Sequence, residues 1–194
     1  MLDIIQQFKF FTPEECQQIK EYAYKKEKEL VDEGHADWSY HEYGSITSNN
    51  YFRYNFFRDH PLYKERLIKF LSHPNVKHQL KWPIKVQSWV NIYRKGQGVT
   101  WHNHIGDMRS SCSANIFIDG PTEPGTTYLI VDGQDLKEVD KENRKGYIQL
   151  SPCFIYHKVK LVESERVSVG ITLHSYDFDN KNTKNTTNII SLRK

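Results

Sequence analysis

Residues 86–176 constrain the fold of this chain more than any other part of the sequence. Short runs rich in β-branched and aromatic residues alternate here with Gly, Pro and Asp. The runs are VQSWVNIY, ANIFID, TTYLIVD, GYIQLS, CFIYHKV and ERVSVGITLHSY. Several short strands separated by frequent turn signals are typical of a sandwich, a barrel or a jelly roll. We therefore expect a mainly β fold.

The residues before this region predict helices. In FTPEECQQIKEYAYKK, Thr12 suits an N-cap, Pro13 the first helical position and Glu15 the third. Pro61 marks the start of a second helix. The aromatic-rich segment 38–57 between them is consistent with strands, a long loop or both. It either packs in the core or covers a pocket, and it is where we expect substrate contacts.

We expect a single domain over residues 1–194. It would comprise N-terminal helices over about 12–80, a jelly-roll core over about 84–176 with the helices packed against it, and a polar, loosely ordered tail over 177–194. No run approaches the ~18 apolar residues of a membrane span, and the N-terminal residues make a poor signal peptide. The three widely spaced cysteines indicate reduced thiols. These features predict a cytoplasmic protein without a membrane partner. The net charge of +3 permits a nucleic-acid partner without indicating one.

Three histidines are candidates for metal ligands. His102 and His104 are two residues apart, so in an extended segment both imidazoles lie on the same side. His157 ends the later run GYIQLSPCFIYH and offers a third nitrogen. Three such ligands would leave positions open for substrate and oxygen. The same spacing also fits ordinary strand histidines, and geometry alone does not decide between the two.

The run ERVSVGITLH alternates strictly between apolar and polar residues. One face carries Arg166, Ser168, Gly170, Thr172 and His174. That polar face either meets water, as in an amphipathic strand, or lines a ligand cavity inside a jelly roll. A guanidinium beside a metal site suits a carboxylate ligand, because its fork makes two charge-assisted hydrogen bonds.

Taken together, these pieces resemble the Fe(II)/2-oxoglutarate-dependent oxygenases over roughly residues 86–174. The pieces are Asn91-x-Tyr93, Gly96, His102 with a further ligand two residues on, His157, and Arg166-x-Ser168. The spacing N-x-Y-x-x-G-x5-H-x is similar to that of the alkylation-repair demethylases. FTPEEC and the run from Gly146 to His157 are more similar to small prolyl-hydroxylase-type members.

The resemblance implies a role for each matching residue. His102 and His157 would ligate Fe(II), and Arg166 would pair with the distal carboxylate of 2-oxoglutarate, helped by Ser168. Asn91 and Tyr93 match positions that bind the cosubstrate. The segment PGTTYL, with Thr126 and Thr127, is similar to a Gly-Thr turn before a core strand. The implied enzyme uses O2 to hydroxylate a C–H bond of a protein, a nucleobase or a small molecule, and the sequence does not identify that prime substrate.

The sequence departs from the family at one ligand. The family has H-x-D or H-x-E, whereas position 104 is His here. Either His104 replaces the carboxylate, or Asp107 supplies it. With His104, the net charge of the iron site rises by one and all its protein ligands are neutral nitrogens. Imidazole suits iron, so a three-histidine site is chemically reasonable.

Two other interpretations remain. GQGVTWHNH fits the cupin pattern G-x5-H-x-H, and GYIQLSPCFIYH fits most of G-x5-P-x-G-x2-H, with Phe154 in place of the last Gly. These similarities would imply a three-histidine metalloenzyme that does not use 2-oxoglutarate and has no need of Arg166. The other alternative is a jelly-roll module that binds sugars or nucleic acid without catalysis. Such a module would not require Fe(II) to bind 2-oxoglutarate.

Overall fold

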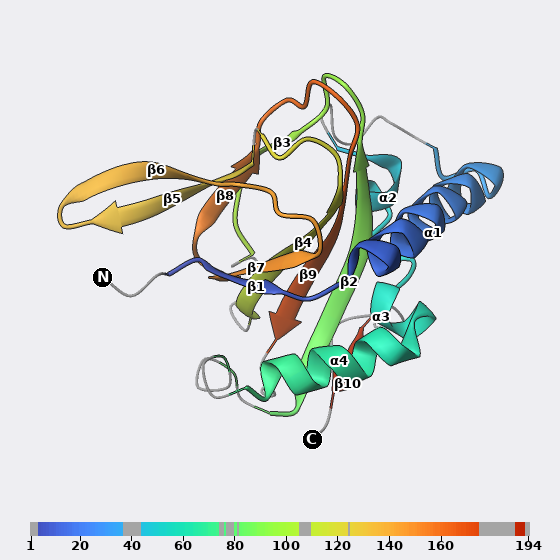
Figure 1. The fold of residues 1–194 in the computed structure, drawn as a ribbon, viewed down its shortest axis with the longest axis horizontal. Helices are drawn as coiled ribbons and strands as arrows, with labels where there is room; N and C mark the ends of the chain where they lie inside the picture. Colours follow the sequence, from blue (N-terminus) through green and yellow to red (C-terminus); the bar gives the residue numbers. More distant parts are fainter. Residues whose placement is uncertain are drawn as a thin grey trace.

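The computed structural model of the chain describes residues 4–36, 44–73, 76, 80, 82–104, 110–123, 125–174 and 189–192. Two antiparallel sheets face each other in a jelly roll, and helices from the first third of the chain pack outside it (Figure 1). The prediction of a mainly β jelly roll with N-terminal helices is confirmed. Among the described helices, none is both long and apolar enough to cross a membrane.

The larger sheet has six strands in the order β1-β7-β4-β9-β2-β10. Their bounds are β1 Gln6–Lys9, β2 Ile84–Tyr93, β4 Ser110–Asp119, β7 Tyr147–Pro152, β9 Arg166–His174 and β10 Ile190–Leu192. The strands at the two ends of this order, β1 and β10, come from outside residues 84–176, where the sequence places the core. Residues 190–192 of the predicted loose tail thus form a strand, paired with Ile84–Val86.

The smaller sheet has four strands in the order β3-β8-β5-β6. Their bounds are β3 Val99–His102, β5 Thr126–Asp132, β6 Asp135–Lys141 and β8 Tyr156–Val159. The hairpin of β5 and β6 extends away from the body of the molecule (Figure 1). Strands β3 and β8 carry His102 and His157, and His104 follows two residues after the end of β3.

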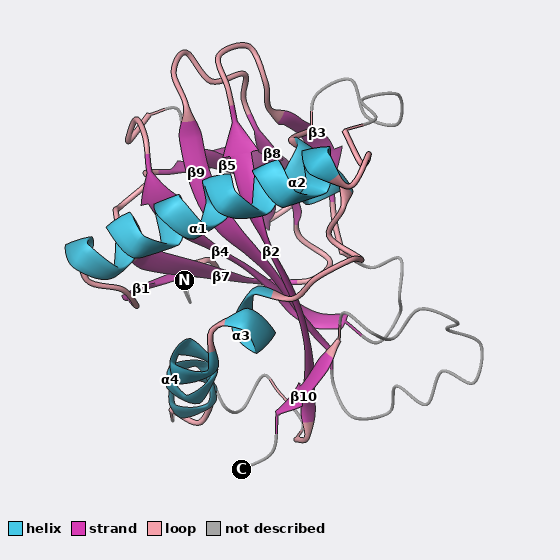
Figure 2. Ribbon diagram, turned by 90° about the vertical axis from the view of Figure 1, so that its right-hand side faces the viewer, coloured by secondary structure: helices cyan, strands magenta, loops and turns pink. Residues whose placement is uncertain are grey.

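The helices cover the outer face of the larger sheet, where α1 lies across the strands (Figure 2). Their bounds are α1 Pro13–Asp32, α2 Ile46–Asn49, α3 Phe56–Asp59 and α4 Pro61–Leu71. The predicted start of α1 is confirmed: Thr12 and Glu15 form a reciprocal capping box, and Pro13 is the first residue. Helix α4 begins at Pro61, as expected.

The aromatic-rich segment 38–57 differs from its prediction. Where it is described, it contains α2 and the start of α3, rather than strands or a continuous loop. Phe56 and Phe57 are fully buried and belong to the main core, whereas Tyr51 and Phe52 remain exposed. The first part of the segment, residues 38–43, lies outside the described residues. Most of the predicted tail, residues 177–188, does so as well.

Strand β9 runs through the middle of the larger sheet, and all nine of its residues are buried. Val167, Val169, Ile171 and Leu173 pack in the hydrophobic core beneath the helices. Because successive side chains alternate between faces, the polar set from Arg166 to His174 faces the smaller sheet. A polar face in contact with water is therefore the wrong interpretation: these side chains line the inside of the jelly roll.

Candidate metal and cosubstrate site

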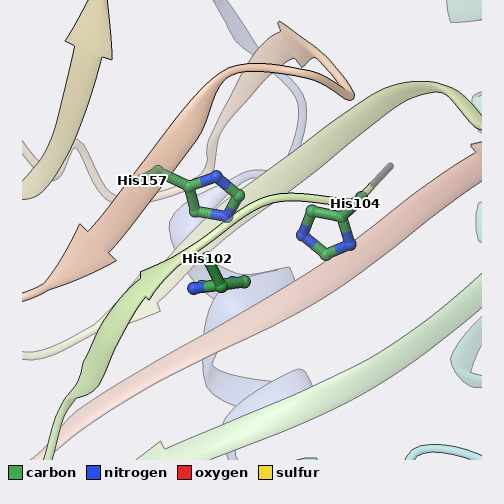
Figure 3. Close-up of side chains that lie close together, drawn as sticks. All are labelled: His102, His104 and His157. Atoms are coloured by element: carbon green, nitrogen blue, oxygen red, sulfur yellow. The ribbon is translucent and has the colours of Figure 1, made fainter. Parts of the chain in front are cut away.

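The three candidate histidines come together between the sheets (Figure 3). His102 ends β3 and pairs in register with His157 of β8, and their ring centroids are 4.2 Å apart. The His104 ring lies 5.4 Å from the ring of His102 and 5.2 Å from that of His157. One nitrogen from each ring lies within 4.8 Å of the others, a grouping that can hold a metal ion.

A hydrogen bond at Nδ1 orients two of these rings, those of His102 and His157. Nδ1 of His102 lies 2.9 Å from the Thr100 carbonyl oxygen, and Nδ1 of His157 lies 3.2 Å from that of Ile155. A carbonyl oxygen only accepts, so in both rings Nδ1 carries the proton and Nε2 keeps its lone pair. This is the outer-shell arrangement that fixes the tautomer of metal-binding histidines.

Burial keeps the three imidazoles neutral. Burial, together with the neighbouring imidazoles of His157 and His102, lowers the pKa of His104 to about 3. It lowers the pKa of His157 to about 4, again with a contribution from His102. The pKa of His102 is also lowered by burial. Because a metal binds the neutral form of imidazole, these rings are ready to ligate at neutral pH.

Arg166 lies on the same interior face, at the start of β9. Arg166 is only 1% exposed. Nη2 donates to Oγ1 of Thr126 at 3.1 Å and to Oδ1 of Asn143 at 3.4 Å. Among the described residues, nothing accepts a hydrogen bond from Nε or Nη1, and no carboxylate forms an ion pair with the group. A buried guanidinium without a counter-charge is costly, and its free donors suit an incoming carboxylate.

Two tyrosines approach this guanidinium. The Tyr93 ring centroid lies 6.0 Å from Cζ of Arg166, and the two residues are register partners on β2 and β9. Tyr128 of β5 also interacts electrostatically with Arg166. Burial lowers the pKa of Arg166, and both tyrosines oppose that change. Within the described part of the chain, the positive charge thus faces phenol groups rather than acids.

Asn91 and Ser168 are engaged with each other and with a tryptophan. Nδ2 of Asn91 donates to Oγ of Ser168 at 3.2 Å, and Nε1 of Trp89 donates to Oδ1 of Asn91 at 2.9 Å. The Trp89 ring lies 6.4 Å from the ring of His104. Asn91 and Ser168, both expected to bind the cosubstrate, therefore also hold the Trp89 ring beside His104.

Sequence reasoning did not assign a role to Trp89, Tyr128 or Asn143. Trp89 shares the alternating face of β2 with Asn91 and Tyr93, and that periodicity could have indicated it. Asn143 is fully buried in the β6–β7 connection, where the sequence carries no comparable signal. Of the predicted residues, Thr126 contacts Arg166, whereas the Thr127 hydroxyl donates to Asp140. Asp107, the alternative third ligand, lies outside the described residues.

Comparison with known proteins supports the fold. No protein-family model matches the sequence, and no curated protein sequence does. Solved structures do match. The prolyl-4-hydroxylase of Pseudomonas putida is 16% identical, with a TM-score of 0.55, and the match covers 89% of this chain and 88% of that one. The viral collagen prolyl hydroxylase vCPH from Paramecium bursaria Chlorella virus-1, in its 2-oxoglutarate complex, is 13% identical, with a TM-score of 0.55. That match covers 90% of this chain and 97% of the viral chain. The non-heme alpha-ketoglutarate-dependent carbocyclase SnoK from nogalamycin biosynthesis is 14% identical, with a TM-score of 0.60. That match covers 89% of this chain and 80% of the SnoK chain.

Proposed function

We propose that the chain is an Fe(II)- and 2-oxoglutarate-dependent oxygenase that oxidises a C–H bond of a prime substrate. The observation that carries the proposal is the buried Arg166, whose Nε and Nη1 have no partner among the described residues. It shares the interior of the jelly roll with the three histidines. Of the similar proteins, SnoK is dependent on alpha-ketoglutarate (2-oxoglutarate), and vCPH was solved as a 2-oxoglutarate complex.

The residues present fit both groups. His102, His104 and His157 would hold the iron through Nε2, because Nδ1 of each ring is already engaged. Arg166 would hold the distal carboxylate of 2-oxoglutarate with the donors that are free, and Thr126 keeps the guanidinium in place. When bound, the iron together with 2-oxoglutarate and O2 supplies the oxidant for the substrate.

The side chains between these two ends set the environment of the reaction. Along β9 and its partner β2, the pair Asn91 and Ser168 lies between Arg166 and Thr172, the residue that contacts His104. Each of the two is less than 10% exposed. Gly170, next along the same face, carries no side chain, and the Trp89 ring packs where its Cβ would be. The interior is thus polar and largely shielded from water, which strengthens the interaction of Arg166 with a carboxylate and protects a reactive centre from side reactions.

A thermal-shift experiment under anaerobic conditions tests this function. Protein is melted with Fe(II) alone, with 2-oxoglutarate alone and with both. At about 100 times its dissociation constant a ligand stabilises the native state by roughly 2.7 kcal/mol. We expect 2-oxoglutarate to raise the melting temperature only when Fe(II) is present. Glutarate, which has the distal carboxylate but lacks the keto group, should have a much smaller effect.

The same experiment separates the alternatives. Stabilisation by Fe(II) without any response to 2-oxoglutarate would contradict the oxygenase and favour a three-histidine metalloenzyme of the cupin kind. No response to either ligand would favour a binding module. His102→Ala provides the control for metal dependence, because it removes one candidate ligand and should abolish both shifts.

A further inference from the structure

His104 is held from three directions. Its backbone N–H donates to the carbonyl oxygen of Cys153 at 3.0 Å. Its Nδ1 lies 3.1 Å from Oγ1 of Thr172 on β9. The Trp89 ring lies 6.4 Å away at an interplanar angle of 34°. The position of this imidazole is therefore defined by parts of the chain that are far apart in sequence.

The partner of its Nδ1 is of a different kind from the partners of the other two histidines. His102 and His157 each face a backbone carbonyl two residues earlier in their own segment. His104 instead faces a hydroxyl, which can accept or donate. If Thr172 accepts, Nδ1 carries the proton and Nε2 is free to ligate. If Thr172 donated, the proton would sit on Nε2 and block it.

The surroundings of Thr172 keep its hydroxyl in place. The residue is 4% exposed and lies in the middle of the larger sheet. Threonine is β-branched, so its χ1 angle has few accessible values in a strand. Two residues earlier, a Cβ on Gly170 would lie only 2.6 Å from Cε2 of Trp89. The bare backbone at Gly170 thus lets the tryptophan approach, while Thr172 supplies the hydrogen bond.

We propose that Thr172 accepts a hydrogen bond from Nδ1 of His104. As the acceptor, it is the positioning residue that selects the tautomer with a proton-free Nε2 and so allows an imidazole to serve as the third ligand. The inference rests on the proposed function. A carboxylate at position 104 could ligate through either oxygen and would need no such selection. An imidazole has one nitrogen facing its partners at the site, and that nitrogen must be free of its proton.

The test is an anaerobic titration of the metal-free protein with Co(II), followed by its visible absorption bands. Thr172→Val has nearly the same shape but lacks the hydroxyl, and Thr172→Ser keeps it. Changes in outer-shell partners typically weaken metal binding about 10- to 100-fold. We expect a loss of that size and altered Co(II) bands for the Val variant, with affinity within a few-fold of native for the Ser variant.

Ser113→Ala is the matched control. Ser113 is the register partner of Thr172 on β4, and its buried hydroxyl is hydrogen-bonded to Ser151 at 3.0 Å rather than to a histidine. The control should lose stability without losing Co(II) affinity. If Thr172→Val does not fold, Thr172→Ala removes the same hydroxyl without a branched side chain.

The outcomes distinguish this inference from the proposed function. Native affinity and native Co(II) bands in the Val or Ala variant would overturn the role of Thr172, as would an equal loss of affinity in Ser113→Ala. His104→Ala is titrated beside them. If it also binds Co(II) as the native protein does, His104 is not a ligand and the three-histidine site itself is wrong. If it loses Co(II) while the Thr172 variants do not, only the positioning role fails.

Discussion

Tyr128 and Gln149 join the two sheets across the interior of the jelly roll. The Tyr128 hydroxyl, on β5, donates to Oε1 of Gln149, on β7, at 3.0 Å, and both residues are 2% exposed. Tyr128 is also the register partner of His157, and their rings lie 5.8 Å apart. The hydrogen bond therefore anchors β5, the strand paired with the one that carries His157, to the opposite sheet.

Tyr128→Phe should destabilise the protein by about 1–3 kcal/mol, because it leaves the buried Gln149 Oε1 without its donor. Urea unfolding measures this change. Tyr156→Phe on β8 is the control, since that side chain is 47% exposed. Adding Gln149→Leu to Tyr128→Phe should recover part of the loss. Equal, small effects of Tyr128→Phe and Tyr156→Phe would show that the bridge contributes nothing.

Arg166→Met should separate stability from binding. Methionine is long and flexible enough to fill the space, and replacing a buried charge with an apolar group is often neutral or stabilising by 1–4 kcal/mol. We expect the ligand-free variant to unfold at the same or a higher urea concentration than the native protein. Its response to Fe(II) should persist, and its response to 2-oxoglutarate should disappear.

Arg94→Met provides the contrast. Arg94 makes a two-pronged ion pair with Glu27, at 2.7 and 2.6 Å, and Glu27 is 9% exposed. Removing this arginine leaves a nearly buried carboxylate without its partner, so stability should fall by about 1–3 kcal/mol. If Arg166→Met is the more destabilising of the two, Arg166 stabilises the ligand-free fold and is not a binding group kept for a carboxylate.

Substitutions at positions 104 and 107 decide the third ligand. If His104 ligates, His104→Asp should keep the metal, because a carboxylate oxygen can take the place of the imidazole nitrogen. Asp107→Asn should leave Fe(II) content and affinity unchanged. Iron content after anaerobic loading and desalting measures both. Loss of iron in Asp107→Asn, with full retention in His104→Ala, would assign the ligand to Asp107.

The metal-free protein should lose stability as the pH falls from about 6.5 to about 4. The pKa values of His104 and His157 are about 3 and about 4 in the folded chain, below the unperturbed value of about 6.5. In this interval the unfolded chain therefore binds protons that the folded chain does not. Each such histidine contributes up to about 1.4 kcal/mol per pH unit.

Urea unfolding at several pH values between 7 and 4.5 measures this dependence. His104→Gln removes one titrating group and should give a shallower decline than the native protein. Identical slopes would show that His104 is not held neutral by its surroundings.

Local features of the fold were predictable from the sequence. The cap at Thr12 and the proline at position 61 fixed the starts of α1 and α4, because short-range hydrogen bonding and backbone geometry decide them. The alternation in ERVSVGITLH predicted the two faces of β9. The side on which its polar face would lie was not predictable, because that depends on the second sheet, which is built from strands elsewhere in the chain.

In the site, too, local sequence patterns predicted some features, while contacts between distant segments were not predictable. Spacing placed His102 and His104 on one side, His157 offered a third nitrogen, and strand alternation put Arg166 on the polar face. The resemblance then implied a role for each. The link from Thr172 to His104 spans 68 residues, and the contact of Arg166 with Asn143 spans 23. Such contacts are set by sheet register and packing, for which single-sequence patterns carry no signal. The pair of short helices in the aromatic-rich segment 38–57 was missed because packing against β2 overrides its mixed local preferences.

The three candidate ligands differ in how well their ring orientation tolerates substitution of the residue that contacts Nδ1. His102 and His157 are oriented by the carbonyl oxygens of Thr100 and Ile155, which every amino acid possesses, so substitutions at 100 and 155 leave the orienting atom in place. His104 depends on the side chain of Thr172. Of all nineteen alternatives at position 172, only serine offers an aliphatic hydroxyl of similar reach. For His102 and His157, substitutions at the partner position thus leave ring orientation nearly unchanged. For His104, the third candidate ligand, ring orientation depends on one side chain.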